Sequence, residues 1–352
     1  MDYKNLLDKI EDAYSKELPF VTYKKPNDKV VKGIFQKKTV LEFSNSFSEE
    51  GFLFAPFNNT EDVILFRIEN SDTYRALLPT SNIPLDGENS TINNDSTKNK
   101  YINLVGSCID FIKRGKAKKV VLSRTEELEL TNFSVTKTFE KLLCNYRNAF
   151  VYVWYHPKVG LWLGATPEQL VRIKLKVFNT VSLAGTQVYK DSLDVNWNKK
   201  ELEEQQIVTN YIESNLNSLI DELSISKPTT IKAGNLLHLK TSIKGLLNDK
   251  FDLKNLIDNL HPTPAVCGMP MNIAKEFILK NEGYKRQFYT GFLGELNIDN
   301  SSDLFVNLRC MKIENLVASL FIGGGITIDS IPENEWLETV EKSKVMKKVL
   351  SN

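Results

Sequence analysis

The chain has 352 residues, of which 41% are hydrophobic and 25% are charged, and its formal net charge at pH 7 is +1. This is the composition of a globular protein with a sizeable core, and the near-zero charge excludes the strong field expected of a protein that binds nucleic acid or acidic membranes. No apolar run approaches the roughly 20 residues that span a bilayer, and the charged N-terminus lacks the apolar segment of a signal peptide.

The cysteines and histidines indicate neither a disulfide framework nor a zinc site. The four cysteines are widely spaced and form no Cys-x-x-Cys pair: Cys108, Cys144, Cys267 and Cys310. Free thiols are therefore expected, which predicts a protein of the reducing cytoplasm. The three histidines form no His-x-His or His-x-x-x-His pair, so the ligand spacing of a zinc site is missing.

The N-terminal quarter of the chain is rich in short strand patterns. A short amphipathic helix pattern is followed, over residues 20–78, by alternating segments that are bounded by Gly, Asn and Asp turns. Residues 81–100 are polar and rich in Asn and Ser, which predicts a flexible loop. We therefore expect a single domain over residues 1–352, with a strand-rich part (1–80), this loop, and a catalytic core over 101–352.

The core alternates between groups of strands and single helices. Helical periodicity is found over residues 101–114, 133–146, 198–223, 252–259 and 272–280. Strand patterns are found over residues 117–124, 151–156, 160–166, 169–175, 177–186, 236–247, 291–298 and 304–313. Runs of strands with helices between hairpins, rather than strict βαβ alternation, predict an α+β fold with antiparallel sheets.

A stretch near the C-terminus combines features of an anion site and of a cation site. An apolar strand pattern over 316–322 leads into Gly323, Gly324 and Gly325, which predict a tight turn with exposed N–H groups. The helix that follows carries three polar residues on one face, at spacings of three and four: Glu335, Glu338 and Lys342. Bare N–H groups can hold a carboxylate, and two carboxylates one turn apart can hold a hard metal ion. An ordinary turn and a solvated helix face are the alternative.

Two further side chains are candidates for proton transfer. Alternation puts Lys119 on the same strand face as Val121 and Ser123, and a lysine that enters an apolar strand can lose its proton and act as a base. Glu168 lies between two strands in an otherwise apolar stretch, where a carboxyl group held protonated could act as a general acid. A solvated strand start and an exposed turn are the alternatives for these residues.

A second pair of carboxylates lies in the predicted helix 198–223. Glu201 and Glu204 share a face with Val208 and Tyr211, so both carboxylates are in line with an apolar stripe. They could complete a set of oxygen ligands with the acidic pair of the C-terminal helix. Alternatively, they are solvated charges in the first turn, where acidic groups favour the helix dipole.

Three polar residues in mostly apolar segments complete the candidates: His238, Tyr289 and Arg309. His238 lies in a strand pattern and is either a core histidine or a site residue. Arg309 falls in a strand pattern of apolar residues, and a buried arginine needs an anionic partner. A substrate carboxylate and a structural glutamate both meet that need.

Nine motifs in a single order resemble those of the chorismate-utilising enzymes, the family of isochorismate synthases, salicylate synthases and the large subunits of anthranilate and aminodeoxychorismate synthases. The motifs run from about residue 101 to the C-terminus: KKVVLSR, GATPEQL, SLAGT, the Glu201/Glu204 helix, LLHLKT, LHPTPAVCGMP, YTGFLGEL, VNLRCMKI, and GGGIT followed by EWLETVEK. The resemblance implies two orthogonally packed antiparallel sheets flanked by helices, and a Mg²⁺-dependent site for chorismate. Residues 1–80 carry no such motif.

The resemblance also implies roles for individual residues. Glu204 and Glu338 would bind Mg²⁺, assisted by Glu201 and Glu335 directly or through water, and which pair contacts the metal is open. The substrate would be held by Ala265, Tyr289, Arg309, Gly323, Gly324, Gly325 and Lys342. His238 would lie near the departing hydroxyl or the ring.

Three positions favour the branch of the family that uses water. Lys119 matches the residue that deprotonates water, and Glu168 matches the acid that protonates the leaving C4 hydroxyl. The segment LHPTPAVCG resembles the isochorismate-forming members, with Pro264, Ala265 and Val266 where the amine-transferring branch has a PAGT- or PAGS-like segment. We therefore expect an isochorismate synthase, in which water attacks C2 of chorismate as the C4 hydroxyl leaves.

Two alternatives for the activity stay open, together with the pathway. A salicylate synthase shares the base and the acid, although its threonine near position 265 is replaced here by alanine. A catalytically idle scaffold that binds chorismate or metal is the other alternative. Isochorismate feeds both menaquinone and catechol siderophores, and menaquinone is the more general use. No amidotransferase subunit is expected, and a monomer is the default expectation.

Overall fold

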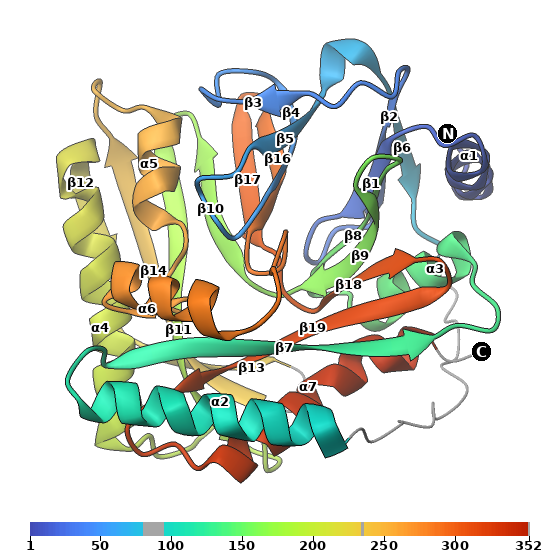
Figure 1. The fold of residues 1–352 in the computed structure, drawn as a ribbon. Helices are drawn as coiled ribbons and strands as arrows, with labels where there is room; N and C mark the ends of the chain where they lie inside the picture. The colour runs from blue at the N-terminus through green and yellow to red at the C-terminus, as the bar shows by residue number, and fades with distance from the viewer. Residues whose placement is uncertain (80–94, 234–235, 351–352) are drawn as a thin grey trace.

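The computed structural model describes residues 1–79, 95–233 and 236–350. They form an α+β fold of two antiparallel sheets with helices around them (Figure 1). The strands of one sheet run across those of the other, as β7 and β19 do relative to β11 and β14 in Figure 1. The predicted fold class is therefore confirmed. No helix in the described ranges is long and apolar enough to cross a membrane.

The two sheets have nine and ten strands, each hydrogen-bonded to the next in the order that follows. The nine-stranded sheet contains β15 (Gly268–Met269), β7 (Lys119–Glu129), β19 (Val317–Ile326), β18 (Cys310–Glu314), β9 (Gly160–Thr166), β8 (Phe150–His156), β1 (Phe20–Lys24), β2 (Val30–Gln36) and β6 (Ser71–Leu77). The ten-stranded sheet contains β12 (Ile220–Ile225), β14 (Leu236–Leu247), β11 (Val177–Val188), β10 (Gln169–Lys174), β17 (Ser301–Val306), β16 (Phe292–Ile298), β4 (Gly51–Ala55), β5 (Val63–Arg67) and β3 (Phe43–Ser44), with β13 (Thr229–Ala233) beside β14.

Helices cover the outer faces of both sheets. The helices are α1 (Tyr3–Ser15), α2 (Asp95–Lys113), α3 (Val135–Asn145), α4 (Lys199–Leu216), α5 (Leu253–Leu260), α6 (Met271–Asn281) and α7 (Pro332–Leu350). Helices α1, α3 and the end of α7 pack on the nine-stranded sheet, and α2 and α6 pack around β7. Helices α4 and α5 pack on the ten-stranded sheet. Each helix buries an apolar stripe in this way.

An aromatic core fills the space between the two sheets. Trp154 and Trp162 from the nine-stranded sheet are fully buried, and they lie against Phe54 from the other sheet. Phe54 also stacks on Phe288, with ring centroids 4.1 Å apart. Large aromatic rings supply the burial that makes this sheet-on-sheet contact stable.

Two of the places where the chain passes from one sheet to the other are neighbours. Glu168 lies where β9 of one sheet leads into β10 of the other, and Arg309 lies where β17 leads back to β18. The two crossings are hydrogen-bonded to each other: the Val306 N–H donates to the Glu168 carbonyl at 2.9 Å, and the Ala165 N–H donates to the Arg309 carbonyl at 3.1 Å. The sequence pattern predicts Arg309 within a strand, but it stands between two strands, with a φ of 49°.

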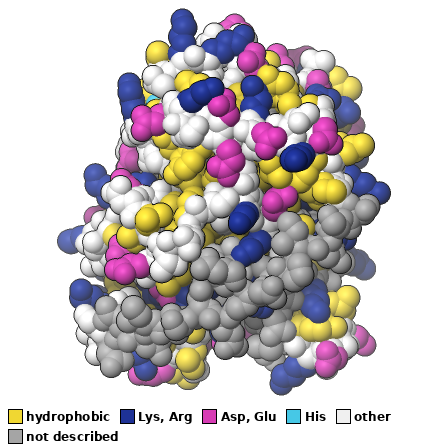
Figure 2. Space-filling view, turned by 90° about the vertical axis from the view of Figure 1, so that its right-hand side faces the viewer, with side chains coloured by type: hydrophobic (Ala, Val, Ile, Leu, Met, Phe, Trp, Pro, Cys, Tyr) yellow, Lys and Arg dark blue, Asp and Glu magenta, His cyan; other side chains and the backbone are white. Residues whose placement is uncertain are grey.

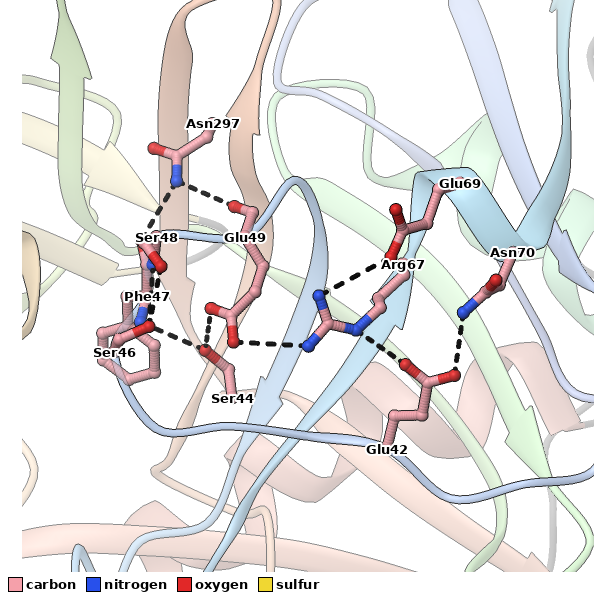
Figure 3. Close-up of polar contacts among 10 residues, drawn as sticks. All are labelled: Glu42, Ser44, Ser46, Phe47, Ser48, Glu49, Arg67, Glu69, Asn70 and Asn297. Carbon is pink, nitrogen blue, oxygen red and sulfur yellow. Dashed lines mark hydrogen bonds and ion pairs between the residues drawn. The ribbon is translucent and has the colours of Figure 1, made fainter.

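The N-terminal strands are built into both sheets. Strands β1, β2 and β6 extend the nine-stranded sheet from β8, and β3, β4 and β5 extend the ten-stranded sheet from β16. Figure 3 shows how the segment before β4 is held: Arg67 at the end of β5 pairs with Glu42, Glu49 and Glu69. The side-chain amide of Asn297 in β16 donates to the Phe47 and Glu49 carbonyls.

Two predicted boundaries differ from the structure. The helix predicted over 198–223 ends at Leu216, and residues 220–225 form the edge strand β12, which pairs with β14. The loop predicted over 81–100 lies mostly outside the described residues, and its last six residues belong to α2.

The face of the molecule in Figure 2 carries basic and acidic side chains interspersed, as the small net charge predicts.

Candidate active site

The predicted site residues come from five helices and strands, and from the segments between others, around one end of β7 and β19. Strand β7 begins with Lys119, and β19 ends with the three glycines. Helix α4 supplies two glutamates, α7 supplies two glutamates and Lys342, and β14 supplies His238. The other four lie in segments between elements: Glu168, Ala265, Tyr289 and Arg309. Figure 1 shows α7 and α2 on one side of the β7–β19 pair.

The three glycines lie in an extended strand, so the predicted tight turn is wrong. Gly323, Gly324 and Gly325 pair with residues 123, 122 and 121 of β7, and none of the three has a positive φ. A Cβ at Gly323 would lie 2.8 Å from the Tyr289 hydroxyl oxygen, and one at Gly325 would lie 2.8 Å from Lys119 Cε. Glycine is needed there because other groups approach the backbone closely.

The glycine segment is the part of β19 that β18 does not cover. Strand β18 pairs with β19 only as far as Leu320, so from Phe321 onward one edge of β19 has no strand beside it. Lys342 of α7 reaches this edge and donates from Nζ to the Gly323 carbonyl at 2.9 Å. A strand edge beside cationic side chains is a surface on which a carboxylate can bind.

Lys119 makes a close ion pair with Glu204. The distance from Nζ to Oε1 is 2.5 Å, and the two side chains are 14% and 25% exposed. The partners lie 85 positions apart in the sequence, at the start of β7 and on the inner face of α4. The predicted base, Lys119, and the predicted metal ligand, Glu204, therefore lie in direct contact.

Glu168 is poised to carry a proton at neutral pH. Burial raises the pKa of its carboxyl group to about 7, and the positive charge of Lys119 opposes that rise. This electrostatic interaction also places Glu168 near Lys119, although the two residues lie on different elements. A carboxyl group with this pKa can donate a proton at pH 7, as a general acid must.

The four predicted metal-ligand carboxylates form two pairs. On α4, Glu201 packs on Gly185 of β11, and its Oε2 is buried without a hydrogen-bond partner. On α7, Glu335 and Glu338 approach Gly324, with one oxygen of each within 3.7 Å of where a Cβ would stand. Among the described residues, no three acidic, histidine or cysteine side chains converge as a ready metal cluster.

The donor chemistry nevertheless suits Mg²⁺. Carboxylate oxygens are the ligands that a hard divalent cation prefers. The buried Glu201 oxygen lacks a partner that such a cation would supply. Lys119 connects the two carboxylate pairs. Its Nζ contacts Glu204 of the α4 pair, and its Cε lies close to Gly325. Gly325 follows Gly324, which the α7 pair approaches.

The predicted substrate-binding cations lie beside the glycine edge. Lys342 Nζ pairs with Glu338 Oε1 at 2.5 Å, and burial lowers the pKa of Lys342. Arg309 Nη1 donates to the Lys342 carbonyl at 3.4 Å, and burial lowers the pKa of Arg309 as well. Tyr289 is buried and stacks on Phe321, with ring centroids 5.5 Å apart.

His238 and Ala265 are each connected to this group through a neighbouring element, β11 for His238 and β15 for Ala265. His238 Nδ1 is 3.0 Å from the Gly185 carbonyl oxygen, next to Glu201, and burial lowers the pKa of its imidazole. Ala265 is partly exposed and precedes β15, whose Met269 pairs with Lys119. Gly185 thus lies between His238 and Glu201, and Ala265 lies in the segment that leads into β15.

Tyr101 belongs to this group, although its sequence pattern does not single it out. Its side chain on α2 is 2% exposed, its hydroxyl has no hydrogen-bond partner, and it lies 3.9 Å from where a Gly324 Cβ would stand. Burial raises its pKa, with Glu335 and Glu338 adding to the rise. No local signal marks this role, because Tyr101 begins a helical pattern in which it fits the apolar stripe.

A separate cavity of about 180 Å³ lies away from these residues. It is bordered by residues 44–63, by α5, and by His261 and Phe292. None of the predicted site residues lines it. The chemistry expected from the sequence is therefore carried by the glycine edge and its neighbours rather than by this cavity.

Comparison with known proteins identifies the family of the chain. Residues 49–351 match the family described as chorismate binding enzyme, and the chain belongs to that family. DhbC of Bacillus subtilis, an isochorismate synthase, is 32% identical over 267 residues, which cover 70% of this chain and 66% of DhbC. The salicylate biosynthesis isochorismate synthase of Pseudomonas aeruginosa is 31% identical over 262 residues, which cover 70% of this chain and 54% of that protein. The matched region thus spans less than two thirds of these relatives.

Two solved structures share the fold. The crystal structure of DhbC from Bacillus anthracis superposes with a TM-score of 0.80 at 24% identity, over 98% of this chain and 100% of that one. MenF of Escherichia coli, the menaquinone-specific isochorismate synthase, superposes with a TM-score of 0.79 at 21% identity, over 94% and 88% of the two chains.

Proposed function

We propose that this protein is an isochorismate synthase, which converts chorismate reversibly to isochorismate. Lys119 would deprotonate a water molecule that attacks C2 of chorismate, while Glu168 protonates the C4 hydroxyl. One water is consumed at C2 and one is released from C4, so the reaction is an isomerisation. Two relatives that are named isochorismate synthases, at 31% and 32% identity, support this proposal.

The observation that carries the proposal is the proximity of Glu168 to Lys119. Burial holds the pKa of Glu168 at about 7 even though Lys119 favours its ionised form. A carboxyl group and a lysine amine that lie near each other on different elements are the residue types that a paired acid and base require. The reaction is close to thermoneutral, so its rate depends mainly on how well the acid, the base and the substrate are positioned.

The remaining residues would bind and orient the substrate. The uncovered edge of β19 at Gly323–Gly325, together with Arg309 and Lys342, would hold the carboxylates, since guanidinium and ammonium groups make strong charge-assisted hydrogen bonds to them. Tyr289 would contribute its hydroxyl from beneath the same edge. Ala265 would line the pocket, and His238 would lie beside the ring or the departing hydroxyl.

Mg²⁺ is the cofactor that the proposal requires. Glu204 and Glu338 would hold it, with Glu201 and Glu335 assisting directly or through water. When bound, Mg²⁺ fixes the C1 carboxylate of the substrate and offsets its charge. The buried Oε2 of Glu201, which lacks a hydrogen-bond partner, supports this assignment.

We propose menaquinone biosynthesis as the pathway, with catechol siderophore biosynthesis as the alternative, and a cytoplasmic monomer without an amidotransferase subunit as the working form. Salicylate, formed by loss of pyruvate from isochorismate, is the alternative product. A scaffold that binds chorismate or metal without turnover is the alternative to an enzyme.

The test of this proposal uses two variants with matched controls. Lys119→Ala and Glu168→Gln are assayed for isochorismate formation from chorismate and Mg²⁺, and each should lose about 10²–10⁴-fold in kcat. Lys118→Ala and Glu129→Gln are the controls, because both residues lie exposed on or beside β7. Full isochorismate formation by Lys119→Ala or Glu168→Gln would remove the role assigned to that residue.

A further inference from the structure

Arg124 lies on β7 five positions after Lys119, and its side chain points to the opposite face of the strand. It is only 6% exposed. A buried guanidinium needs partners for its donors, and here those partners connect it to α7. The helix that it contacts is the one that carries Glu335 and Glu338.

The guanidinium of Arg124 makes three kinds of contact. Its Nε donates to Thr339 Oγ1 at 2.8 Å, and its Cζ lies 4.4 Å from the ring centroid of Trp336. Its Nη1 and Nη2 donate to Glu126 Oε2 at 3.1 Å each. Glu126 in turn forms an ion pair with Lys347, near the end of α7. Arg124 and Glu126 therefore hold α7 at two places along its length.

The first half of α7 buries few of its residues fully. The buried apolar residues of the helix are Met346, Val349 and Leu350, all in its last turns. In the first half only Thr339 is fully buried, and Leu337 is 58% exposed. Trp336 packs on Tyr101 of α2, with ring centroids 6.1 Å apart, but little other apolar burial fixes the part of α7 that carries the carboxylates. The polar contact with Arg124 supplements this packing.

The anchored residues are direct neighbours of the carboxylates. Trp336 follows Glu335, and Thr339 follows Glu338. We propose that Arg124 is a positioning residue for Mg²⁺ binding: by holding Trp336 and Thr339 it fixes Glu335 and Glu338 against Gly324. Strand β7 would then place the base directly through Lys119 and the metal ligands indirectly through Arg124. This inference rests on the proposed function.

Lysine cannot replace arginine at this position. A lysine keeps the charge, but a single ammonium group cannot make the separate directed contacts that Nε, Nη1 and Nη2 make to Thr339 and Glu126. Outer contacts that orient metal ligands are worth about 10–100-fold in metal affinity. Because Arg124 acts through the neighbours of the ligands, we expect Arg124→Lys to weaken Mg²⁺ binding by about 10-fold.

The test measures Mg²⁺ affinity by calorimetric titration of the full chain with MgCl₂, and thermal unfolding midpoints in parallel. The variants are Arg124→Lys, Thr339→Val and the double variant. Thr339→Val keeps the side-chain shape, so it serves if Arg124→Lys folds poorly. Arg67→Lys is the matched control, because Arg67 also bridges carboxylates but lies in the cluster of Figure 3, which contains none of the site residues.

A positioning role predicts that Arg124→Lys and Thr339→Val both weaken Mg²⁺ binding, that the double variant is no worse than Arg124→Lys by more than about twofold, and that Arg67→Lys binds as the wild type does. Unchanged Mg²⁺ affinity in Arg124→Lys and Thr339→Val, whatever their unfolding midpoints, would overturn the inference and leave the proposed function intact. Failure of the wild type to bind Mg²⁺ would overturn the metal site of the proposed function itself, and this inference with it.

Discussion

The three glycines of β19 allow a test in which one substitution should have three different results. A Cβ at Gly323 would lie 2.8 Å from the Leu122 carbonyl oxygen, and a Cβ at Gly325 would lie 2.8 Å from Lys119 Cε. A Cβ at Gly324 would meet nothing closer than 3.6 Å, which is ordinary contact. Each glycine has a φ that alanine can adopt, so the differences come from space alone.

The expected magnitudes follow from what each Cβ meets. At Gly323 the obstacle is backbone in the β7–β19 ladder, so Gly323→Ala should lower the free energy of unfolding by about 1–3 kcal/mol. At Gly325 the obstacle is a flexible lysine side chain. Gly325→Ala should therefore change stability by less than about 0.5 kcal/mol but displace Lys119, and a displacement approaching 1 Å can cost about 10²-fold in rate. Gly324→Ala should be neutral or stabilising by up to about 1 kcal/mol.

Urea unfolding and Mg²⁺-dependent chorismate turnover, measured on the same three preparations, separate these outcomes. Gly324→Ala is the internal control for stability, since the substitution is chemically the same and one position away. Equal loss of stability in Gly323→Ala and Gly324→Ala would refute the argument that glycine is needed at position 323 because the β7 backbone approaches it closely. Full activity in Gly325→Ala would refute the requirement for Lys119 at its present position.

The remaining predictions concern protonation and metal. Burial raises the pKa of Glu168 from 4.5 to about 7. The stability that its protonated form contributes is complete below pH 4.5 and is lost as the pH rises through 7. The free energy of unfolding of Glu168→Gln, measured with urea, should therefore rise relative to that of the wild type by about 2 kcal/mol between pH 5 and pH 8. Burial lowers the pKa of Lys24 from 10.5 to about 8. As the pH rises, Lys24 therefore loses its proton at a lower pH in the folded state than in the unfolded state. In the same assay, the free energy of unfolding of the wild type should rise relative to that of Lys24→Met by up to about 3 kcal/mol between pH 8 and 10.5. A difference that does not change with pH would contradict the lowered pKa. Chelation by EDTA should abolish turnover and added Mg²⁺ restore it, with Glu338→Gln needing about 10-fold more Mg²⁺; turnover that persists in EDTA would exclude the metal.

Much of the fold could be predicted because its signals are local. Strands such as β8 and β9 are short apolar runs with clear turns between them, and the sequence pattern marks them within a residue or two. The predicted end of α4 is wrong because helical propensity continues past Leu216, and only pairing with β14 makes residues 220–225 a strand. The strand predicted at Arg309 is wrong because the apolar pattern runs unbroken through the crossing between the sheets.

The candidate site shows the same division between local and tertiary signals. Helix spacing is enough to put Glu335, Glu338 and Lys342 on one face, and the structure has Glu338 and Lys342 in contact. The predicted glycine turn is wrong, because a local glycine pattern usually signals a turn, whereas here it serves close approach by Lys119 and Tyr289 from distant elements. Contacts of this kind depend on tertiary packing, which a local pattern does not encode.

Attack of water on C2 of chorismate is the step on which the proposed function depends. It can be followed by incubating the protein with chorismate and Mg²⁺ in H₂¹⁸O, with chromatographic identification of the product and mass analysis of its oxygen. We expect isochorismate in equilibrium with chorismate, with ¹⁸O in the C2 hydroxyl. Salicylate and pyruvate as the only products would replace the proposed activity with the alternative one. Isochorismate without ¹⁸O, or chorismate unchanged, would contradict the proposed attack by water.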